Sequence, residues 1–163
     1  MPTSRPNRRS LLVGLTALVG ASGGRTHAAE TLPKVTVSRD PSCGCCGAWV
    51  DHIRQAGFPA EVVETSGVNR IKARLGVPPA LASCHTAEVD GFVIEGHVPA
   101  SALKRLLAER PAGAKGLAVP GMPVSSPGME IAGVDADEYD VVLFGETGQR
   151  RFARFKGGRE LTA

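Results

Sequence analysis

Apolar and polar residues alternate along KVTVSR, residues 34–39, and this segment is rich in valine. A period of two over such a segment predicts a β-strand. Two further segments have the composition of strands, AEVVET at residues 60–65 and GFVIEG at residues 91–96. The sequence therefore predicts three strands between residues 34 and 96.

Apolar residues recur at helical spacing directly after the first predicted strand. Trp49, Val50 and Ile53 fall on one face of this predicted helix, and Gly57 follows its end. His52 lies near the opposite, polar face, where we expect it to be solvated. The segment therefore predicts an amphipathic helix that packs against the sheet.

The rest of the chain continues the alternation of strands and helices. A short helix is predicted over residues 68–75, and a longer one opens at Pro99 and closes before Pro111. Residues 112–137 are rich in Gly, Pro and Ser with little regular pattern, and residues 139–155 predict a β-hairpin. The order of these elements predicts an α/β domain, with a small sheet flanked by helices and a C-terminal β-hairpin.

The N-terminal segment has the pattern of an export signal. Residues 2–9 carry three arginines and no acid, residues 11–21 are largely apolar, and small residues lead to a cleavage site after Ala28. The apolar stretch is far shorter than the roughly 20 residues that span a membrane. We therefore expect residues 1–28 to be removed by the Sec or the twin-arginine route. Residues 29–163 would then form one periplasmic domain with no membrane span.

Cleavage at this site changes the charge of the protein. The predicted signal holds four of the nineteen Lys and Arg residues and none of the sixteen acidic residues. The mature chain then has fifteen basic and sixteen acidic residues, a formal charge of −1 in place of +3. The basic composition of the full chain therefore gives no support to a nucleic-acid partner.

Three of the four cysteines lie within DPSCGCCGAW, residues 40–49, between the first predicted strand and the first predicted helix. Unpaired backbone N–H groups and the helix dipole favour thiolates at such a position. A thiolate is both the nucleophile of disulfide exchange and a soft metal ligand. A disulfide between the adjacent Cys45 and Cys46 would be strained, so the spacing argues against a purely structural role.

The third thiol of this cluster helps to decide between thiol–disulfide exchange and metal binding. A dithiol oxidoreductase would use Cys43 and Cys46 as a C-x-x-C pair, and a third thiol invites wrong pairing. A soft-metal site gains from each added thiolate, because Cu(I) prefers sulfur ligands. The spacing therefore favours metal binding by Cys43, Cys45 and Cys46, with dithiol exchange as the alternative and a structural zinc domain as a third possibility.

Candidates to complete such a site lie elsewhere in the chain. Cys84 and His85 lie just before a predicted strand, His97 follows one, and Met122 and Met129 lie in the irregular segment. Each has a plain structural role as its alternative, such as packing, capping or gap filling. For Cys84 we predict a sulfur within roughly 4–7 Å of a cluster sulfur, because metal–sulfur bonds near 2.3 Å limit the separation of two ligands.

Residues 34–155 closely resemble the domain of unknown function family 411. The resemblance rests on CGCCGAWVDH, on IKARLGVPPALASCHTAEVDGFVIEGHVPA and on GLAVPGMPVSSPGME. Members of this family are small exported metal-binding proteins associated with copper resistance. The resemblance implies a thioredoxin-like fold and the handling of copper, as Cu(I), at the cysteine cluster, with other periplasmic copper proteins as partners. It leaves open whether the protein turns over a substrate as a copper or thiol–disulfide oxidoreductase.

The resemblance carries residue roles only where the motifs match. It implies copper ligands at Cys43, Cys45, Cys46 and Cys84, with the two histidines and two methionines less firmly assigned. Some relatives carry a further cysteine pair near the C-terminus, whereas this chain ends GGRELTA. A mechanism that needs a second thiol pair is therefore in doubt. Thioredoxins also place a cis-proline against the active site, and the sequence leaves open whether Pro78, Pro79 or neither does so.

Overall fold

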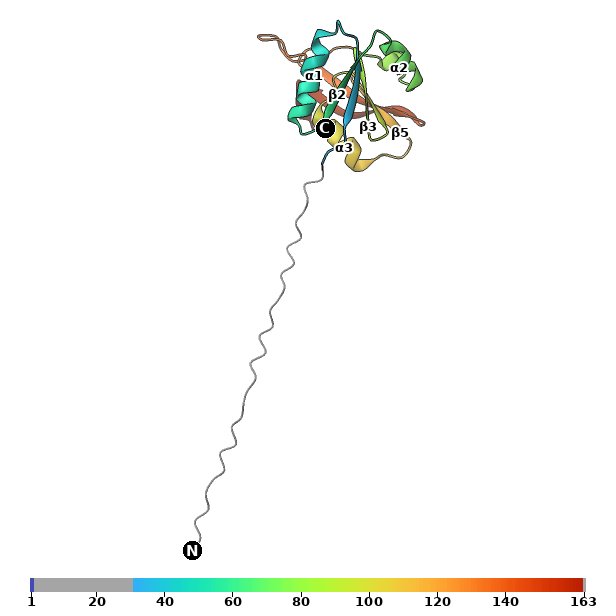
Figure 1. Ribbon diagram of the computed structural model, residues 1–163. Coiled ribbons are helices and arrows are strands. Elements are labelled where there is room, and N and C mark those ends of the chain that lie inside the picture. Colours follow the sequence, from blue (N-terminus) through green and yellow to red (C-terminus); the bar gives the residue numbers. More distant parts are fainter. Residues whose placement is uncertain (2–30, 163) are drawn as a thin grey trace. The chain divides into compact units, whose positions relative to one another are not determined.

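The computed structural model describes Met1 and residues 31–162, so most of the predicted export signal lies outside the described residues. Eight strands form one sheet in the order β2-β1-β3-β4-β5-β6-β7-β8 (Figure 1). The strands are β1 (Val35–Arg39), β2 (Ala60–Glu64), β3 (His85–Val89), β4 (Phe92–Glu95), β5 (Ala114–Ala118), β6 (Glu138–Gly145), β7 (Gly148–Lys156) and β8 (Arg159–Leu161). The predicted α/β class and the C-terminal hairpin are confirmed.

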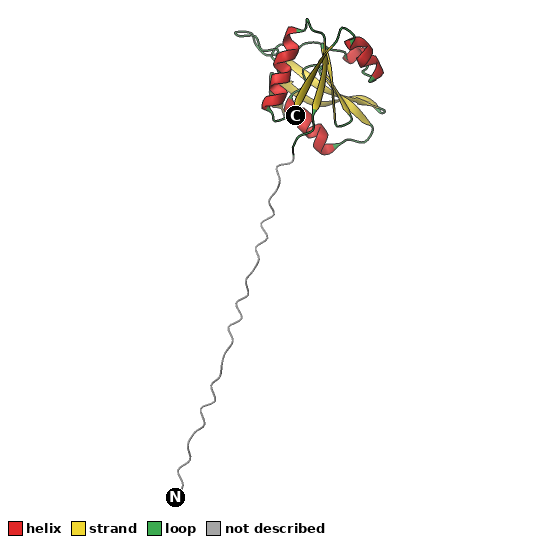
Figure 2. Cartoon of the chain, viewed as in Figure 1, coloured by secondary structure: helices red, strands yellow, loops and turns green. Residues whose placement is uncertain are grey.

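Helices pack on both faces of this sheet (Figure 2). On one face, α1 (Gly44–Gln55) and α3 (Ala100–Glu109) enclose the main hydrophobic core with the inward side chains of the strands. On the other face, α2 (Val68–Arg74) and the 3-10 turn η1 (Pro79–Leu81) lie over the sheet, where Val77 and Leu81 form a smaller cluster with Val93. The sheet therefore has one large apolar face and one smaller one.

The N-terminal half has the connections expected of a thioredoxin-like domain. Strands β1 and β2 pair in parallel, with α1 as the crossover between them, and β3 pairs antiparallel with β1. Because β1 runs directly into α1, the cysteine cluster lies at the end of the sheet where this helix begins. Thioredoxin-like domains gather their reactive groups at this end.

Three strands, β3, β5 and β8, were not predicted, and β3 changes the setting of Cys84. The segment predicted as a single third strand is one arm of a hairpin, in which β3 pairs with β4. The turn residues Asp90 and Gly91 have φ of 46° and 83°, as a two-residue hairpin turn requires. The Asp-Gly pair is a strong hairpin signal in the sequence, and Cys84 immediately precedes the strand that it reveals.

The C-terminal half enlarges the sheet beyond the small one predicted. The expectation of irregular structure over residues 112–137 is wrong for β5, which pairs in parallel with β4. A Cβ atom added to Gly116 would lie 1.8 Å from the Val93 carbonyl oxygen, so this strand needs glycine where the two backbones approach. Strands β6 and β7 form the predicted hairpin, and β8 adds a short edge strand.

Among the described residues, no helix is both long and apolar enough to cross a membrane.

Candidate metal centre

The cysteine cluster is held by the turn that joins β1 to α1. Asp40 accepts hydrogen bonds from the backbone N–H and the hydroxyl of Ser42, and its carbonyl accepts the Cys43 N–H at 3.0 Å. Arg39 then donates to the Cys43 carbonyl at 3.0 Å. Cys43 occupies the N-cap position of α1 without a side-chain cap, and Cys45 and Cys46 lie in its first turn. This local geometry points three sulfurs from one helix start toward one place.

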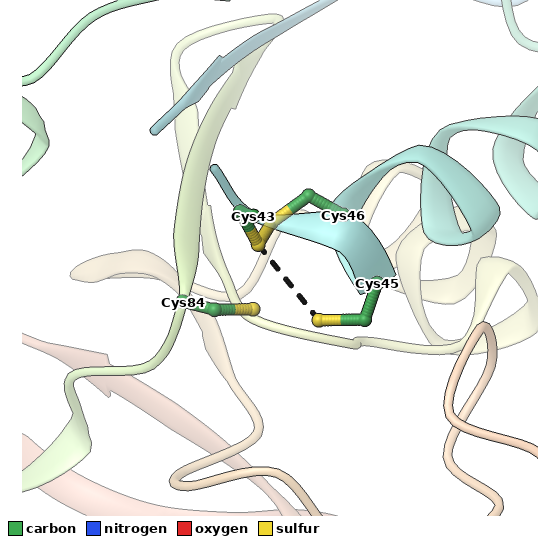
Figure 3. Close-up of side chains that lie close together, drawn as sticks. All are labelled: Cys43, Cys45, Cys46 and Cys84. Carbon is green, nitrogen blue, oxygen red and sulfur yellow. Dashed lines mark hydrogen bonds between the residues drawn. A yellow bond between two sulfur atoms is a disulfide. The ribbon is translucent and has the colours of Figure 1, made fainter. Parts of the chain in front are cut away.

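The structure brings all four cysteine sulfurs together (Figure 3). Cys43 and Cys46 form a disulfide, while Cys45 and Cys84 are free thiols. The Cys45 sulfur lies 3.8 Å from that of Cys43, and the four sulfurs lie within 4.8 Å of one another. Cys84 reaches them from the opposite side, at the start of β3. The prediction that its sulfur lies near the cluster is confirmed.

Two histidines flank the Cys84 sulfur. This sulfur lies 3.3 Å from His85 Nδ1 and 3.1 Å from His97 Nε2, and the three ligand atoms lie within 4.8 Å of one another. His97 Nδ1 lies 2.8 Å from the Pro127 carbonyl, which can only accept a hydrogen bond. His97 Nδ1 therefore carries a proton, and in the neutral ring Nε2 presents a lone pair to Cys84. A fixed tautomer of this kind is typical of metal-binding histidines.

Burial keeps these groups neutral in the protein without metal. His85 is fully buried, and burial, together with His97 and Lys72, holds its pKa well below the ordinary value. Burial also lowers the pKa of His97. Burial and the neighbouring Cys45 raise the pKa of the Cys84 thiol to about 11. The cluster therefore presents neutral donors that lose a proton, in the case of the thiols, when they bind a cation.

Within the part of the chain that the structure describes, His85 Nε2 is a buried nitrogen without a hydrogen-bond partner. Its ring centroid lies 4.4 Å from that of Trp49 and 5.1 Å from that of His97. An unpaired buried polar atom is costly, so its presence beside a cluster of soft donors is consistent with a ligand-binding role. The sequence placed Trp49 on the apolar face of a helix, but nothing in it indicated that its ring would pack against this histidine.

The segment after β5 closes the site from a third side. A Cβ atom added to Gly128 would lie 2.6 Å from the Trp49 backbone nitrogen, so this loop lies directly on α1. Met122, 56% exposed, and the half-buried Met129 belong to this loop. Among the described contacts, the loop reaches the site through the Pro127 carbonyl, and no contact joins either methionine sulfur to the cluster.

His52 departs from the sequence expectation. It is half-buried, and its Nε2 accepts the Ala100 N–H at 3.0 Å, so it caps the start of α3 in place of facing water. Burial lowers its pKa. The sequence expectation was wrong because the partner is a backbone group 48 residues away.

The position opposite the Cys43–Cys46 pair is filled by a thiol. No peptide bond in the described residues is cis, so neither Pro78 nor Pro79 has the cis-proline role. Cys84 lies against the pair instead. The end of the sheet that carries a dithiol in thioredoxins therefore carries four cysteine sulfurs in this protein.

The fold and the four converging sulfurs together define the class of this protein. It is a thioredoxin-like α/β domain with a four-cysteine cluster. A family profile described as "Protein of unknown function, DUF411" matches residues 81–129. Two solved structures are similar, "Copper resistance protein copG- Form 2" and "Copper resistance protein copG- Form 1", each at 40% identity and a TM-score of 0.71. The alignments cover 76% and 77% of this chain and 98% and 99% of the two structures. The chain therefore belongs to the DUF411 family of copG-type proteins. No curated protein sequence matches it.

Proposed function

We propose that this protein binds copper, as Cu(I), through Cys43, Cys45, Cys46 and Cys84. In the periplasm it would protect the cell by sequestering the ion or by handling its redox change. The convergence of four sulfurs from two chain segments carries the proposal. The resemblance to a copper resistance protein supports it. Other copper-handling proteins of the periplasm are the expected partners.

The chemistry of the donor set fits Cu(I). Thiolates and imidazoles are soft or borderline ligands that suit Cu(I), whereas Mg²⁺ and Ca²⁺ prefer oxygen. Four thiolates would also hold zinc, which is the structural-zinc alternative. The copper resistance name of the relatives favours copper over zinc. His85 and His97 are the next candidate ligands, because both approach the Cys84 sulfur, and Met122 and Met129 follow.

Binding by all four cysteines requires reduction of the disulfide. Cys43 and Cys46 take up two electrons and two protons to become two thiols, which a periplasmic thiol reductant can supply. Each thiol that then binds copper loses its proton. Metal loading therefore depends on the redox state of this pair, and the reduced protein is the copper-binding form.

Metal analysis of the anaerobically purified, reduced domain tests the proposal. Residues 29–163 should hold copper after dialysis and compete for Cu(I) with a chromophoric chelator. Cys45→Ser should lower the affinity or the stoichiometry, since Cys45 is then a ligand. Unchanged copper binding by this variant, or a domain that retains only zinc, would contradict the proposal.

A thiol–disulfide oxidoreductase is the second candidate function. The disulfide that joins a half-exposed Cys43 to a fully buried Cys46 favours it, because exchange needs one accessible sulfur. Such an enzyme would pass two electrons from a thiol reductant to a substrate disulfide. An insulin-reduction assay separates the two functions, since Cys45→Ser should leave reductase turnover intact.

We also propose that the protein is exported. The support is the arginine-led apolar segment before Ala28, which lies outside the described residues. Mass spectrometry of the native protein from a periplasmic fraction should find an N-terminus near Ala29. Replacing Arg8 and Arg9 by Lys tests the route, because twin-arginine export alone should fail. A full-length cytoplasmic product would contradict export.

A further inference from the structure

A buried ion pair lies on the face of the sheet that α2 covers. Lys72 Nζ donates to Glu95 Oε1 at 2.5 Å and to the Thr86 hydroxyl at 2.8 Å. The two charged side chains are 7% and 0% exposed. Lys72 comes from α2, Thr86 from β3 and Glu95 from β4, so the pair joins three elements.

The Glu95 carboxylate has two further partners, and both belong to the segment that carries Cys84. It accepts the Ser83 N–H at 2.6 Å and the Thr86 hydroxyl in a short hydrogen bond. Ser83 directly precedes Cys84, and Thr86 follows it by two residues. One carboxylate therefore holds the chain on both sides of the cysteine.

Tight backbone packing strengthens this attachment. The Gly96 N–H donates to the His85 carbonyl at 3.0 Å. A Cβ atom added to Gly96 would lie 2.5 Å from the Ser83 hydroxyl oxygen, so the two segments touch. The network lies on the opposite face of the sheet from His85, because successive side chains of a strand alternate. It holds the Cys84 segment through Ser83 and Thr86, and none of its hydrogen bonds is to a cysteine sulfur.

Stability alone does not account for a pair buried in this way. Transfer of two charges out of water costs about as much as their attraction returns, and apolar replacements of similar volume are often neutral or stabilising. Removal of one partner alone is costly, because it leaves an unpaired buried charge. The hydrogen bonds of this pair restrict where Ser83 and Thr86 can lie relative to β4.

We infer that Glu95, oriented by Lys72, is a positioning residue that fixes the Cys84 sulfur against the Cys43–Cys46 loop. It acts through the Ser83 N–H and the Thr86 hydroxyl, and it touches neither the sulfurs nor copper. This inference rests on the proposed function for its purpose, because Cys84 is the ligand that the network serves. The contacts of Glu95 and Lys72 with the Cys84 segment are present without copper.

The first test uses the disulfide form without metal, in which Cys45 and Cys84 are the free thiols. The variant Lys72→Met/Glu95→Leu removes both charges and leaves none unpaired. Its Cys84 should react with iodoacetamide several-fold faster than in the wild type, while Cys45 reacts at an unchanged rate. Glu61→Gln breaks the exposed pair with Lys34 and is the matched control. Equal Cys84 rates in the variant and the wild type would overturn the inference, whether or not the protein binds copper.

The second test is a double-mutant cycle on Cu(I) affinity in the reduced protein. Loss of the network should weaken binding about 10-fold with Cys84 present, as is usual when a group that orients a ligand is removed. In the Cys84→Ser background it should weaken binding less than about 2-fold, because the network then has no ligand to position. Equal losses in both backgrounds would mean a general structural role and would overturn the inference. A wild type without Cu(I) affinity refutes the proposed function, and the alkylation rates then decide the positioning role.

Discussion

The two segments that supply the sulfurs differ in how the fold holds them. Cys43, Cys45 and Cys46 lie within four residues at the start of one helix, and one turn with its own hydrogen bonds positions them. Cys84 is positioned by tertiary contacts, including a buried carboxylate from β4 and the side chains of His85 and His97. We call the first the local half of the site and the second the assembled half.

This difference separates what each half needs in order to form. The local half needs the helix start and a short turn, so it can form whenever β1 and α1 meet. The assembled half needs α2, β3, β4 and the loop at Pro127 to be in place. Changes in the tertiary packing should therefore alter the reactivity of Cys84 more than that of Cys45.

Replacement of Trp49 should have the largest effect on stability, because this residue contacts both halves of the site. It is fully buried on α1, its ring packs on His85, and its Nε1 donates to the Val98 carbonyl at 2.9 Å. Trp49→Ala should lower the free energy of unfolding by about 4 kcal/mol, as expected for a large core truncation. Denaturant titration of the oxidised protein measures the change.

Phe58→Ala is the control for Trp49. Phe58 is 2% exposed in the same core but follows the far end of α1. We expect a loss of stability of about 3 kcal/mol or more from it, with the reactivity of Cys84 unchanged. Trp49→Ala should instead expose Cys84 to alkylation. Equal Cys84 rates in the two variants would show that Trp49 fills space without joining the halves.

Gly96→Ala should give the next largest effect. Gly96 has φ of 70°, and an added Cβ would lie 2.6 Å from the Ser83 Cβ and 2.7 Å from the Val119 carbonyl oxygen. Backbone strain and overlap together should cost about 3 kcal/mol of unfolding free energy. Gly91→Ala is the matched control, since its φ is 83° but no atom lies within 4 Å of an added Cβ. It should cost about 1 kcal/mol, from strain alone. Equal costs would mean that Gly96 does not hold Ser83 in place.

The same division explains what the sequence could predict. The strand, the crowded cysteines and the helix over Trp49 lie next to one another, so local pattern and chemistry identified the local half. The topology of a thioredoxin-like domain also placed Cys84 near it. The neighbours of Cys84 could not be predicted, because Lys72 and Glu95 resemble ordinary surface charges until α2 packs on the sheet.

Two failures of the sequence analysis have definite physical causes. Strand β5 has glycine where it crosses close to Val93, which removes the alternation that marks a strand. His52 lies on the polar face of its helix by spacing, yet the N-terminus of α3 covers it. In both cases the deciding partner lies far away in the sequence.

The pH dependence of stability should follow from the buried histidines, mainly those of the assembled half. Burial, His97 and Lys72 hold the pKa of His85 well below its ordinary value, and Arg39 adds to this. Well above a pH of about 6.5 the ring is neutral in both the folded and the unfolded states, so it contributes no pH dependence there. Below that pH the unfolded state takes up a proton that the folded state does not, and stability falls by up to about 1.4 kcal/mol per pH unit.

His85→Gln checks this dependence in the metal-free, oxidised protein. Unfolding titrations between pH 7 and pH 5 should show a shallower fall in stability for the variant than for the wild type. A remaining slope is expected, because burial also lowers the pKa of His52 and His97. Identical slopes in the two proteins would mean that His85 takes up a proton in the folded state as readily as in the unfolded state.

The smallest effect should come from the support of the local half, and it tests whether that half is held by its own turn. Arg39 donates to the Cys43 carbonyl and pairs with Glu64 at 2.6 Å, but Asp40 and Ser42 already close the turn. Arg39→Met should therefore cost about 1 kcal/mol, the usual loss for such a hydrogen bond, and should leave the Cys45 alkylation rate within about 2-fold of wild type. Lys34→Met removes a more exposed pair with Glu61 and should cost less than about 0.5 kcal/mol. If Arg39→Met raises the alkylation rate of Cys45 as strongly as loss of the Lys72–Glu95 pair raises that of Cys84, then the local half of the site also depends on long-range contacts.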